Sequence, residues 1–433
     1  MATSFDVIVV GAGPAGSAAA LAVARTGRSV ALVERGPFPG SKNMYGGVIY
    51  GRILDGIIPN WWEQAPIQRW VTRRGTMIMT PTQAVTVDFR DEGWGVAPYN
   101  GATAYRPEFD AWLADHAVEA GATLLCSTTA TGLLKDGSRI LGVRTDRPDG
   151  ELLAPVVIAA DGVNSFLAKE AGMYHHSEPK HYTLGVKETI HLGKQTIDER
   201  FGLRGREGAD FEIMGCTGGI PGGGFVYTNL ETVAVGVVLQ LPGLASQDKR
   251  PEEVIGALKA HSAIAPLIEG GEVVEYSAHV IPEGGMHMMP DLITDGMMIT
   301  GDAAAMCLAA GIWLEGVNFA IGSGYAAGQA AVEALRLGDV SAAGLEGYRR
   351  RIESSFVLAD HRKFAEVPDL IMGERMQTKY PQAICNLASD IFTVTNPVPK
   401  KGFQSMARAE LKRSGLKLSE VGKDMWAGFR SFR

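Results

Sequence analysis

Residues 5–35 read FDVIVVGAGPAGSAAALAVARTGRSVALVER, and this stretch decides the fold. Phe5–Val10 is a short apolar run of mostly β-branched residues without alternation, which predicts a buried strand. Ser17–Arg25 is rich in Ala and Leu and predicts a helix, and Ser29–Val33 predicts the next strand. The order strand, helix, strand indicates a βαβ unit of a parallel sheet.

The loop Gly11-Ala-Gly13-Pro14-Ala15-Gly16 joins the first strand to the helix and is typical of a dinucleotide site. Gly11 allows the tight turn, and Gly13 has no side chain to obstruct the pyrophosphate. Gly16 lets the helix pack closely on the sheet. The free N–H groups and the positive dipole end of the helix would then face the phosphates.

Glu34 ends the second strand, 23 residues after Gly11. A carboxylate at this position can accept both ribose hydroxyls, which indicates an unphosphorylated ribose. The pattern therefore fits FAD or NAD and excludes NADP, and the loop alone does not choose between the first two.

Two later strand ends favour FAD. Asp161-Gly162 closes the predicted strand Val156–Ala160, and Gly301-Asp302 closes Met297–Thr300. Asp302 is suited to hold the ribityl hydroxyls of a flavin.

A second glycine-bearing loop, from Gly311 through Gly316 and Val317 to Asn318, precedes a predicted helix that ends at Leu335. The N-terminus of that helix would face the pyrimidine edge of a flavin, which is negative when the flavin is reduced.

These segments together resemble the FAD fold group that includes aromatic hydroxylases and geranylgeranyl reductases. Arg106 begins a predicted helix to Ala120 and matches the arginine that reaches the flavin phosphates in that group. Within the group the chain is similar to FixC proteins, relatives of electron-transfer-flavoprotein:quinone oxidoreductase (ETF-QO). The motifs that carry this likeness are Ser41–Gly47, Gly185–Glu188, Gly222–Thr228, Glu275–Val280 and Gly301–Ala304.

The resemblance implies further FAD contacts at Arg35, Lys42, Asn43, Gly46, Gly47 and Ala130. It also implies that quinone contacts the backbone of the glycine segment Gly222, Gly223 and Gly224. Phe225 and Tyr227 would form the walls of that quinone site. Ala305 departs from the pattern, which usually has Gly after Gly-Asp-Ala-Ala.

The function implied by the resemblance is electron transfer from an electron-transfer flavoprotein to membrane quinone, on the quinone branch of a FixABCX-type bifurcating complex. The chain lacks the cysteine-rich ferredoxin-like segment of the mitochondrial enzymes, which implies a separate iron–sulfur subunit. Cys126, Cys216, Cys307 and Cys385 lie outside metal-ligand spacing, so neither a metal nor a cluster is expected in this chain. The FAD is expected to be noncovalent.

Two other functions remain open from the sequence. One is a monooxygenase or geranylgeranyl-reductase-like enzyme whose flavin is reduced directly by NAD(P)H. The other is a flavin-bearing structural subunit. Bleaching of the flavin by NADH would favour the first, and quinone reductase activity would exclude the second.

The expected fold class is α/β, a Rossmann-like FAD-binding domain of the glutathione-reductase and aromatic-hydroxylase type with a β-rich quinone or substrate lobe. Residues 61–100 predict short strands and turns. The FAD-binding domain is expected over residues 1–80, 103–180 and 291–360, the β-rich lobe over 81–102 and 181–290, and a helical C-terminal segment over 361–433.

The formal net charge of −7 argues against nucleic acid as the main partner. No stretch predicts a membrane-spanning helix, so we expect a cytoplasmic protein with peripheral contact at the cytoplasmic face of the membrane. Residues 400–433 carry nine Lys or Arg against three Asp or Glu, which fits a solvated tail, a docking surface for an acidic protein, or contact with anionic lipid. Ile57–Trp62 and the Met-rich Gly284–Pro290 fit either interfacial anchors or core packing.

Overall fold

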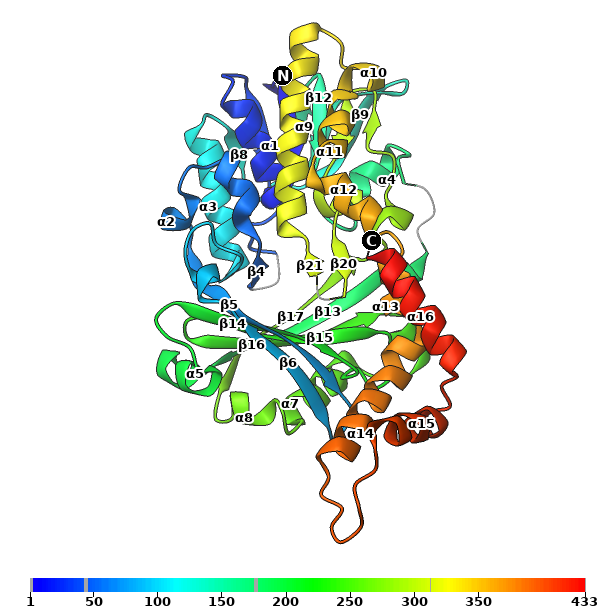
Figure 1. The fold of residues 1–433 in the computed structure, drawn as a ribbon. Coiled ribbons are helices and arrows are strands. Elements are labelled where there is room, and N and C mark those ends of the chain that lie inside the picture. Colours follow the sequence, from blue (N-terminus) through cyan, green and yellow to red (C-terminus); the bar gives the residue numbers. More distant parts are fainter. Residues whose placement is uncertain (1–2, 43–45, 175–177, 312, 433) are drawn as a thin grey trace.

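The computed structural model describes residues 3–42, 46–174, 178–311 and 313–432 (Figure 1). A six-stranded sheet with helices around it forms the upper layer in this view, and a nine-stranded sheet lies below it. The C-terminal helices run down one side of both layers.

The six-stranded sheet contains the strands predicted from the apolar runs. Its strands run parallel except at the edge pair β18–β19. In the register of the sheet, Val10 lies beside Val33 and Ala159, so three connecting loops leave at one edge. In spatial order the strands are β18 (Ile293–Thr294), β19 (Met297–Ile299), β12 (Val156–Ala159), β2 (Val7–Val10), β3 (Val30–Val33) and β8 (Thr123–Leu125).

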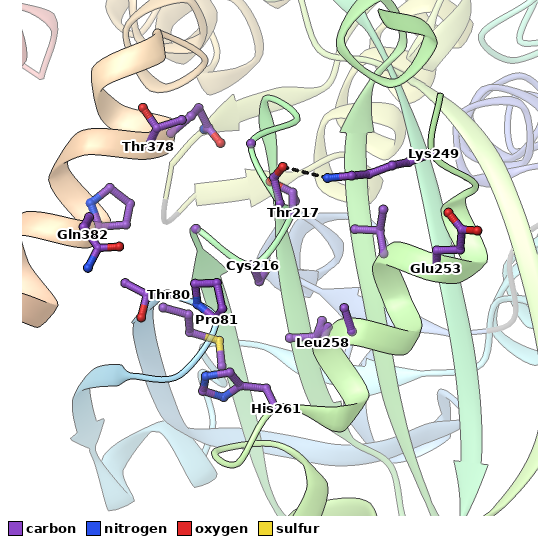
Figure 2. Close-up of a pocket in the computed structure, with 18 residues that line it drawn as sticks. Thr80, Pro81, Cys216, Thr217, Lys249, Glu253, Leu258, His261, Thr378 and Gln382 are labelled. Atoms are coloured by element: carbon purple, nitrogen blue, oxygen red, sulfur yellow. Dashed lines mark hydrogen bonds between the residues drawn. The ribbon is translucent and has the colours of Figure 1, made fainter. Parts of the chain in front are cut away.

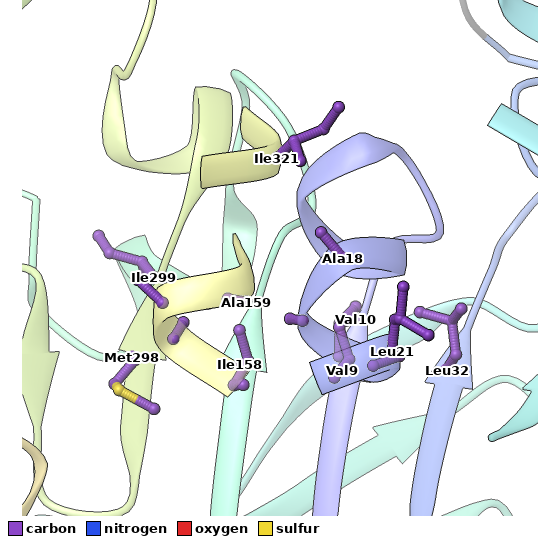
Figure 3. Packing of buried hydrophobic residues seen from close by; sticks show 14 of the residues in the cluster. Val9, Val10, Ala18, Leu21, Leu32, Ile158, Ala159, Met298, Ile299 and Ile321 are labelled. Atoms are coloured by element: carbon purple, nitrogen blue, oxygen red, sulfur yellow. The ribbon is translucent and has the colours of Figure 1, made fainter. Parts of the chain in front are cut away.

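Helix α1 (Pro14–Ala24) packs on this sheet through small side chains, and Figure 3 shows Ala18 and Leu21 of this helix with Val9 and Val10 of β2. α1 also lies against α9 (Val317–Leu337) and α3 (Arg106–Glu119). A Cβ atom at Gly324 of α9 would lie 2.0 Å from the carbonyl oxygen of Ala15, so only glycine permits this helix contact. The three helices begin and end within a few residues of the predicted positions.

A small four-stranded sheet extends the upper layer. It contains β1 (Thr3–Ser4), β11 (Glu151–Leu153), β10 (Arg139–Thr145) and β9 (Ala130–Asp136). The short helix α4 (Phe166–Glu170) packs beside β9.

The nine-stranded sheet is built around a long strand, β5, which runs from Ile67 to Met79. The expectation of short strands in residues 61–100 was therefore wrong for this strand. β14 pairs along one edge of β5, while β7 and then β6 pair along the other, and these partners together hold all 13 residues in one strand. The spatial order is β17 (Glu272–Pro282), β13 (Tyr182–His191), β16 (Thr232–Gln240), β15 (Gly222–Thr228), β14 (Glu207–Met214), β5, β7 (Ala102–Ala104) and β4 (Gly47–Ile49), with β6 (Ala84–Arg90) also paired to β5.

Three helices lie on the lower face of this sheet, opposite the upper layer (Figure 1): α5 (Lys194–Phe201), α7 (Pro251–Ala260) and α8 (Ala265–Ile268). They enclose a second hydrophobic core that is separate from the core of the six-stranded sheet. Its members include Val186, Phe211, Val226 and Val237.

The C-terminal segment is helical, as predicted, and follows α12 (Phe356–Lys363). It contains α13 (Val367–Ile371), a π-helical turn (Arg375–Lys379), α14 (Tyr380–Phe392), α15 (Phe403–Ser414) and α16 (Leu418–Ser431). Among the residues that the structure describes, no helix combines the length and hydropathy needed to cross a bilayer.

The two segments considered as membrane anchors belong to the core instead. Trp61 is 2% exposed, and its indole N–H donates to Asp55 (2.8 Å). Its ring packs edge to face against Trp62 and Trp70, so it fills the interior and cannot reach lipid. Met288 is buried as well, and its neighbours Met286 and Met289 pack against the same core.

Candidate FAD-binding site

A cavity of about 470 Å³ lies between the loop edge of the six-stranded sheet and the upper face of the nine-stranded sheet. Most residues predicted to contact FAD line it, although they come from segments as far apart in sequence as Gly11 and Val317. The predicted residues in its wall are Gly11, Gly13, Pro14, Ala15, Glu34, Arg35, Lys42, Gly46, Gly47, Arg106, Ala130, Asp161, Gly162, Asp302, Gly316 and Val317.

Four of the residues predicted to contact FAD are not among those that line the cavity. Gly16 packs α1 onto the loop, since a Cβ atom there would lie 1.8 Å from the carbonyl oxygen of Gly11. Gly301 faces Ala15, and Gly311 lies against Ile371 of α13. The side chain of Asn318 donates to Glu315 (2.5 Å). Asn43 lies outside the described residues.

The glycine loop is shaped for an anion at the start of α1. Gly11 has φ +99°, a conformation that side-chain-bearing residues rarely adopt. No described atom lies within 4 Å of the position that a Cβ of Gly13 would take, although Gly13 lines the cavity. No side chain in the described part of the chain caps the helix, so its first N–H groups are available to a phosphate.

Glu34 is 8% exposed and holds the loop and its own turn together. Its carboxylate accepts the backbone N–H groups of Ala12 (3.0 Å) and Gly36 (2.6 Å). A carboxylate has about four acceptor positions, so Glu34 keeps capacity for ribose hydroxyls at the cavity wall.

The guanidinium of Arg106 is held by a bidentate pair with Asp110, both bonds measuring 2.8 Å. This pair fixes Arg106 at the cavity wall, and its role as a partner of the flavin phosphates stays a prediction.

Asp302 and His279 both line the cavity, and their charges interact. Burial raises the pKa of Asp302, although the charges of His279 and Arg106 oppose the shift. Burial also lowers the pKa of His279, so a neutral imidazole is favoured there. An acceptor such as Asp302 fits the ribityl hydroxyls of a flavin.

The start of α9 forms the end of the cavity at Gly316 and Val317. Because these residues begin the helix, its positive N-terminal end faces the cavity. No described side chain caps the helix, so its first N–H groups are available to a ligand. With the open Gly13, the free acceptors of Glu34 and two uncapped helix ends, these residues fit FAD.

The upper face of the nine-stranded sheet carries a buried ionic cluster that the sequence did not reveal. Asp210 and Glu212 are alternate residues of β14 and therefore share a face, and both pair with Arg74 of β5. Arg74 also lies over the ring of Tyr50, 5.6 Å from its centre. Burial, together with the charge of Glu212, raises the pKa of Asp210 to about 8, although Arg74 opposes this.

Lys187 of β13 is a second buried charge on this face. Its ammonium group donates to the carbonyl oxygen of Gly46 (3.2 Å), which lines the cavity. Burial lowers the pKa of Lys187 to about 8, although the charge of Glu275 opposes the shift.

The residues predicted to bind quinone all lie in β15, in the middle of the sheet, and the alternation of the strand divides them between its faces. A Cβ of Gly224 would meet Leu258 of α7, below the sheet, and Gly222 shares that face. Gly223 has the opposite orientation with Phe225 and Tyr227, whose rings stack 5.7 Å apart. The amide of Gly222 donates to Gln377 (3.1 Å).

Several cavity residues escaped sequence reasoning, including His279, Ile281, Thr128 and Cys307. His279 belongs to the motif Glu275–Val280, which indicated the family, but the sequence offered no reason to place this histidine in the FAD cavity. Lys187, Arg74 and Asp210 gave a weaker signal, because charged residues in a strand usually face solvent.

Family comparisons agree with this architecture. A family described as FAD dependent oxidoreductase matches residues 6–188, and one described as ETF-QO/FixC family C-terminal domain matches residues 367–433.

Individual relatives align over nearly the whole chain. The sequence is 40% identical over 413 residues to a probable electron transfer flavoprotein-quinone oxidoreductase of Escherichia coli K12, with 95% of this chain and 96% of the relative covered. It is 42% identical over 420 residues to the protein FixC of Salmonella typhimurium, covering 96% and 97%. A geranylgeranyl bacteriochlorophyll reductase-like structure from Thermoplasma acidophilum has a TM-score of 0.73 at 20% identity, covering 99% of this chain and 100% of that one. At that identity the likeness shows the fold alone.

Proposed function

This chain belongs to the ETF-QO/FixC family of FAD-dependent oxidoreductases, and from that membership we propose that it passes electrons from an electron-transfer flavoprotein through its FAD to membrane quinone. The observation that carries the proposal is the roughly 40% sequence identity to a probable electron transfer flavoprotein-quinone oxidoreductase and to a FixC protein. This identity extends across both sheets and the C-terminal helices. When bound, FAD supplies the redox chemistry, and the chain binds and orients it.

A reconstitution tests this function. The FAD-loaded chain, together with the separate ferredoxin-like iron–sulfur protein that the resemblance implies, is mixed with NADH alone and then with reduced electron-transfer flavoprotein, and the reduction of a short-chain quinone is followed. We expect quinone reduction only with the flavoprotein. Rapid anaerobic bleaching of the flavin by NADH alone would instead favour the NAD(P)H-dependent monooxygenase or reductase class.

The assignment of the ADP half of FAD to the glycine loop has its own test. Gly13→Val puts a branched side chain into open space beside the loop, so folding should be unaffected while the pyrophosphate is blocked. We expect FAD affinity to fall at least a hundredfold, about 3 kcal/mol. Gly56→Val, at the end of the short helix Gly51–Gly56, also points into open space and lies outside the cavity wall, so it is the matched control. Equal FAD affinity in Gly13→Val and wild type would refute the assignment.

We propose that a separate ferredoxin-like iron–sulfur protein docks on α16, within a FixABCX-type complex in which this chain serves the quinone branch. One face of α16 exposes Met425, Trp426 and Phe429, and Trp426 is 66% exposed. At the end of the helix, Phe432 packs 5.7 Å from Trp313 of β21 (Trp313–Glu315), the strand that leads into the cavity residue Gly316. A cluster docked there would lie on the FAD side of the molecule.

Removing the apolar face tests this docking. Trp426→Ser with Phe429→Ser should weaken copurification of the iron–sulfur protein without changing FAD content. Leu337→Ser, an equally exposed apolar residue at the end of α9, is the control. Undiminished copurification of the double variant would exclude α16 as the docking surface.

We propose that the loop after α14, from Phe392 to Lys401 and called the tip below, contacts the cytoplasmic face of the membrane. Here Phe392 is 84% exposed, and Val394 and Val398 are also exposed. Lys400 and Lys401 follow directly and can meet anionic headgroups. In Figure 1 this loop projects farthest from the upper layer.

Vesicle flotation tests the tip. Phe392→Ser with Val394→Ser should move the protein from anionic vesicles to the soluble fraction, whereas Val273→Ser, an exposed residue of β17, should not. If the double variant floats like wild type, the membrane contact lies elsewhere.

A further inference from the structure

Lys187 is a buried cation directly beneath the FAD cavity. Its side chain is 1% exposed, and its ammonium group donates to the carbonyl oxygen of Gly46 (3.2 Å), a residue of the cavity wall. Glu275 of the neighbouring strand β17 attracts this charge without forming an ion pair with it. A buried charge without an ion pair costs free energy of folding, and such groups are common where they serve a site.

The segment Gly46–Gly47 lies between Lys187 and the cavity. Both glycines line the cavity, and Gly47 begins β4, which pairs with β7 at the edge of the same sheet. A Cβ atom at Gly46 would lie 3.5 Å from the hydroxyl of Tyr227, another residue of the upper face. Lys187 therefore binds the segment from the sheet side, and its charge lies one residue away from the space that FAD would occupy.

The arrangement of the two sheets determines which half of FAD comes near Lys187. The glycine loop at Gly11–Gly13 and the predicted ribose partner Glu34 lie at the loop edge of the six-stranded sheet. The cavity continues from there to the upper face of the nine-stranded sheet, where Gly46 and Gly47 line it. With its ADP half at the loop edge, FAD would direct its flavin ring toward the side that carries Lys187.

The charged groups that act on Lys187 have partners of their own. Glu275 attracts its charge, and Arg106 repels it. The carboxylate of Glu275 accepts a hydrogen bond from the hydroxyl of Thr189 (3.1 Å), and Arg106 is held by its bidentate pair with Asp110. Neither group forms an ion pair with Lys187, so the positive charge of Lys187 is not neutralised locally.

A positive charge at the flavin end of the cavity would act on the balance between oxidised and reduced flavin. Reduction adds two electrons from a donor and one proton from water to the ring, and it leaves one negative charge on the pyrimidine edge. A buried cation nearby attracts this charge strongly, because little water screens it, and has little effect on the neutral oxidised ring.

We propose that Lys187 is a positioning residue of the FAD site: it holds the Gly46 segment from the sheet side, and its positive charge favours the reduced flavin over the oxidised flavin. The proposal deepens the proposed function and rests on it only through the binding of FAD. The charge that costs stability in the sheet is, on this proposal, the same charge that makes the flavin easier to reduce.

The redox balance of the bound flavin tests this role. Xanthine and xanthine oxidase slowly reduce the FAD-loaded protein beside a reference dye, without electron-transfer flavoprotein or quinone, and the absorbance gives the ratio of reduced to oxidised flavin. In Lys187→Met this ratio at a given potential should fall about tenfold, which lowers the flavin potential by about 30 mV. Lys187→Gln keeps an N–H donor for Gly46 but not the charge, and it should show the same fall.

A variant of opposite sign makes the test specific to charge. Glu275→Gln removes the negative charge that acts on Lys187 and keeps an acceptor for the hydroxyl of Thr189. The ratio of reduced to oxidised flavin should therefore rise in this variant.

Lys249→Met is the matched control, because Lys249 also donates to a glycine carbonyl oxygen, that of Gly218 (2.9 Å). It does so in a second cavity, of about 530 Å³, on the lower face of the nine-stranded sheet. Figure 2 shows this lower cavity, whose wall combines α7, the β5–β6 turn, the loop that precedes β15 and the start of α14. The sheet separates Lys249 from the FAD cavity, so this variant should keep the wild-type ratio.

A fall in both Lys187 variants, a rise in Glu275→Gln and no change in Lys249→Met would support the proposal. A wild-type ratio in Lys187→Gln would overturn it, because the bond to Gly46 and not the charge would then carry any effect of Lys187→Met. FAD content and melting temperature report whether each variant has folded. If the Lys187 variants do not retain FAD, Glu275→Gln decides, and an unchanged or lowered ratio there would overturn the proposal.

The outcome is independent of the proposed electron transfer to quinone, because xanthine oxidase supplies the electrons. Wild-type ratios in all variants would overturn the role of Lys187 and leave the proposed function intact. A wild-type chain that shows no quinone reduction in the reconstitution, while its variants shift the flavin ratio as expected, would refute the proposed function alone.

Discussion

The two faces of the nine-stranded sheet are both buried, but they differ in character. The lower face, which α5, α7 and α8 cover, is apolar and includes Phe211 of β14 and Val186 of β13. The upper face, toward the FAD cavity, carries Asp210 and Lys187, which directly neighbour those two residues in sequence. Adjacent residues of one strand therefore serve stability on one side and charge chemistry on the other.

This contrast separates two uses of burial. Apolar side chains gain free energy when they leave water, whereas a buried charge costs free energy unless it is paired. The upper face keeps several such charges, of which Lys187 reaches the wall of the FAD cavity through its bond to Gly46, and shifted pKa values are common at functional sites. The difference between the faces predicts different responses to substitution and to pH.

The largest expected effect comes from breaking the ionic cluster. Arg74→Met leaves Asp210 and Glu212 buried without their cation, which should cost about 3 kcal/mol of unfolding free energy at pH 8. The pKa of Asp210 is already raised, and loss of Arg74 raises it further. Stability of the variant should therefore fall as pH rises from about 5 to 8, more steeply than in wild type. Urea unfolding at both pH values measures this, and equal losses would show that the cluster is not coupled to protonation.

Lys187→Met should have a smaller effect of opposite sign. The folded pKa of Lys187 is lowered to about 8, so the folded state binds fewer protons than the unfolded state between pH 8 and the ordinary lysine value. Wild-type stability should rise with pH in that window, and the variant should lack this rise. At pH 7 the variant no longer carries the free-energy cost of burying the Lys187 cation, and the lost bond to Gly46 offsets part of that gain. We therefore expect the variant to be more stable by about 2 kcal/mol. Parallel stability curves from pH 7 to pH 11 would mean that Lys187 is not a buried cation.

Sequence reasoning reached the parts of the molecule that local patterns determine. The strands around Gly11 and Glu34, the helix after Gly316 and the family itself follow from short motifs in a fixed order. The contacts of FAD and quinone stay predictions.

Features that depend on tertiary packing were not accessible in this way. Trp61 follows the turn residues Pro59 and Asn60 in sequence and stands in no periodic apolar pattern, yet it fills the core beside Gly51. The pairing of Arg74 with Asp210 joins residues 136 positions apart, and strand alternation alone does not tell which face meets the cavity. The lower cavity exists only because α7, α14 and two loops converge.

The smallest expected effect compares neighbouring valines of β16. Val237 is fully buried on the lower face, opposite Val186 and Gly224, whereas Val238 lies on the upper face and is partly exposed. Val237→Ala removes two methyl groups from a closed core and should cost about 2 kcal/mol, independent of pH because no charge is involved. Val238→Ala should cost under about 1 kcal/mol, since its site is already open. FAD content should be unchanged in both, and urea unfolding at pH 6 and pH 9 measures the difference. A pH-dependent loss in Val237→Ala, or equal losses in both variants, would remove the distinction between an apolar face for stability and a charged face for chemistry.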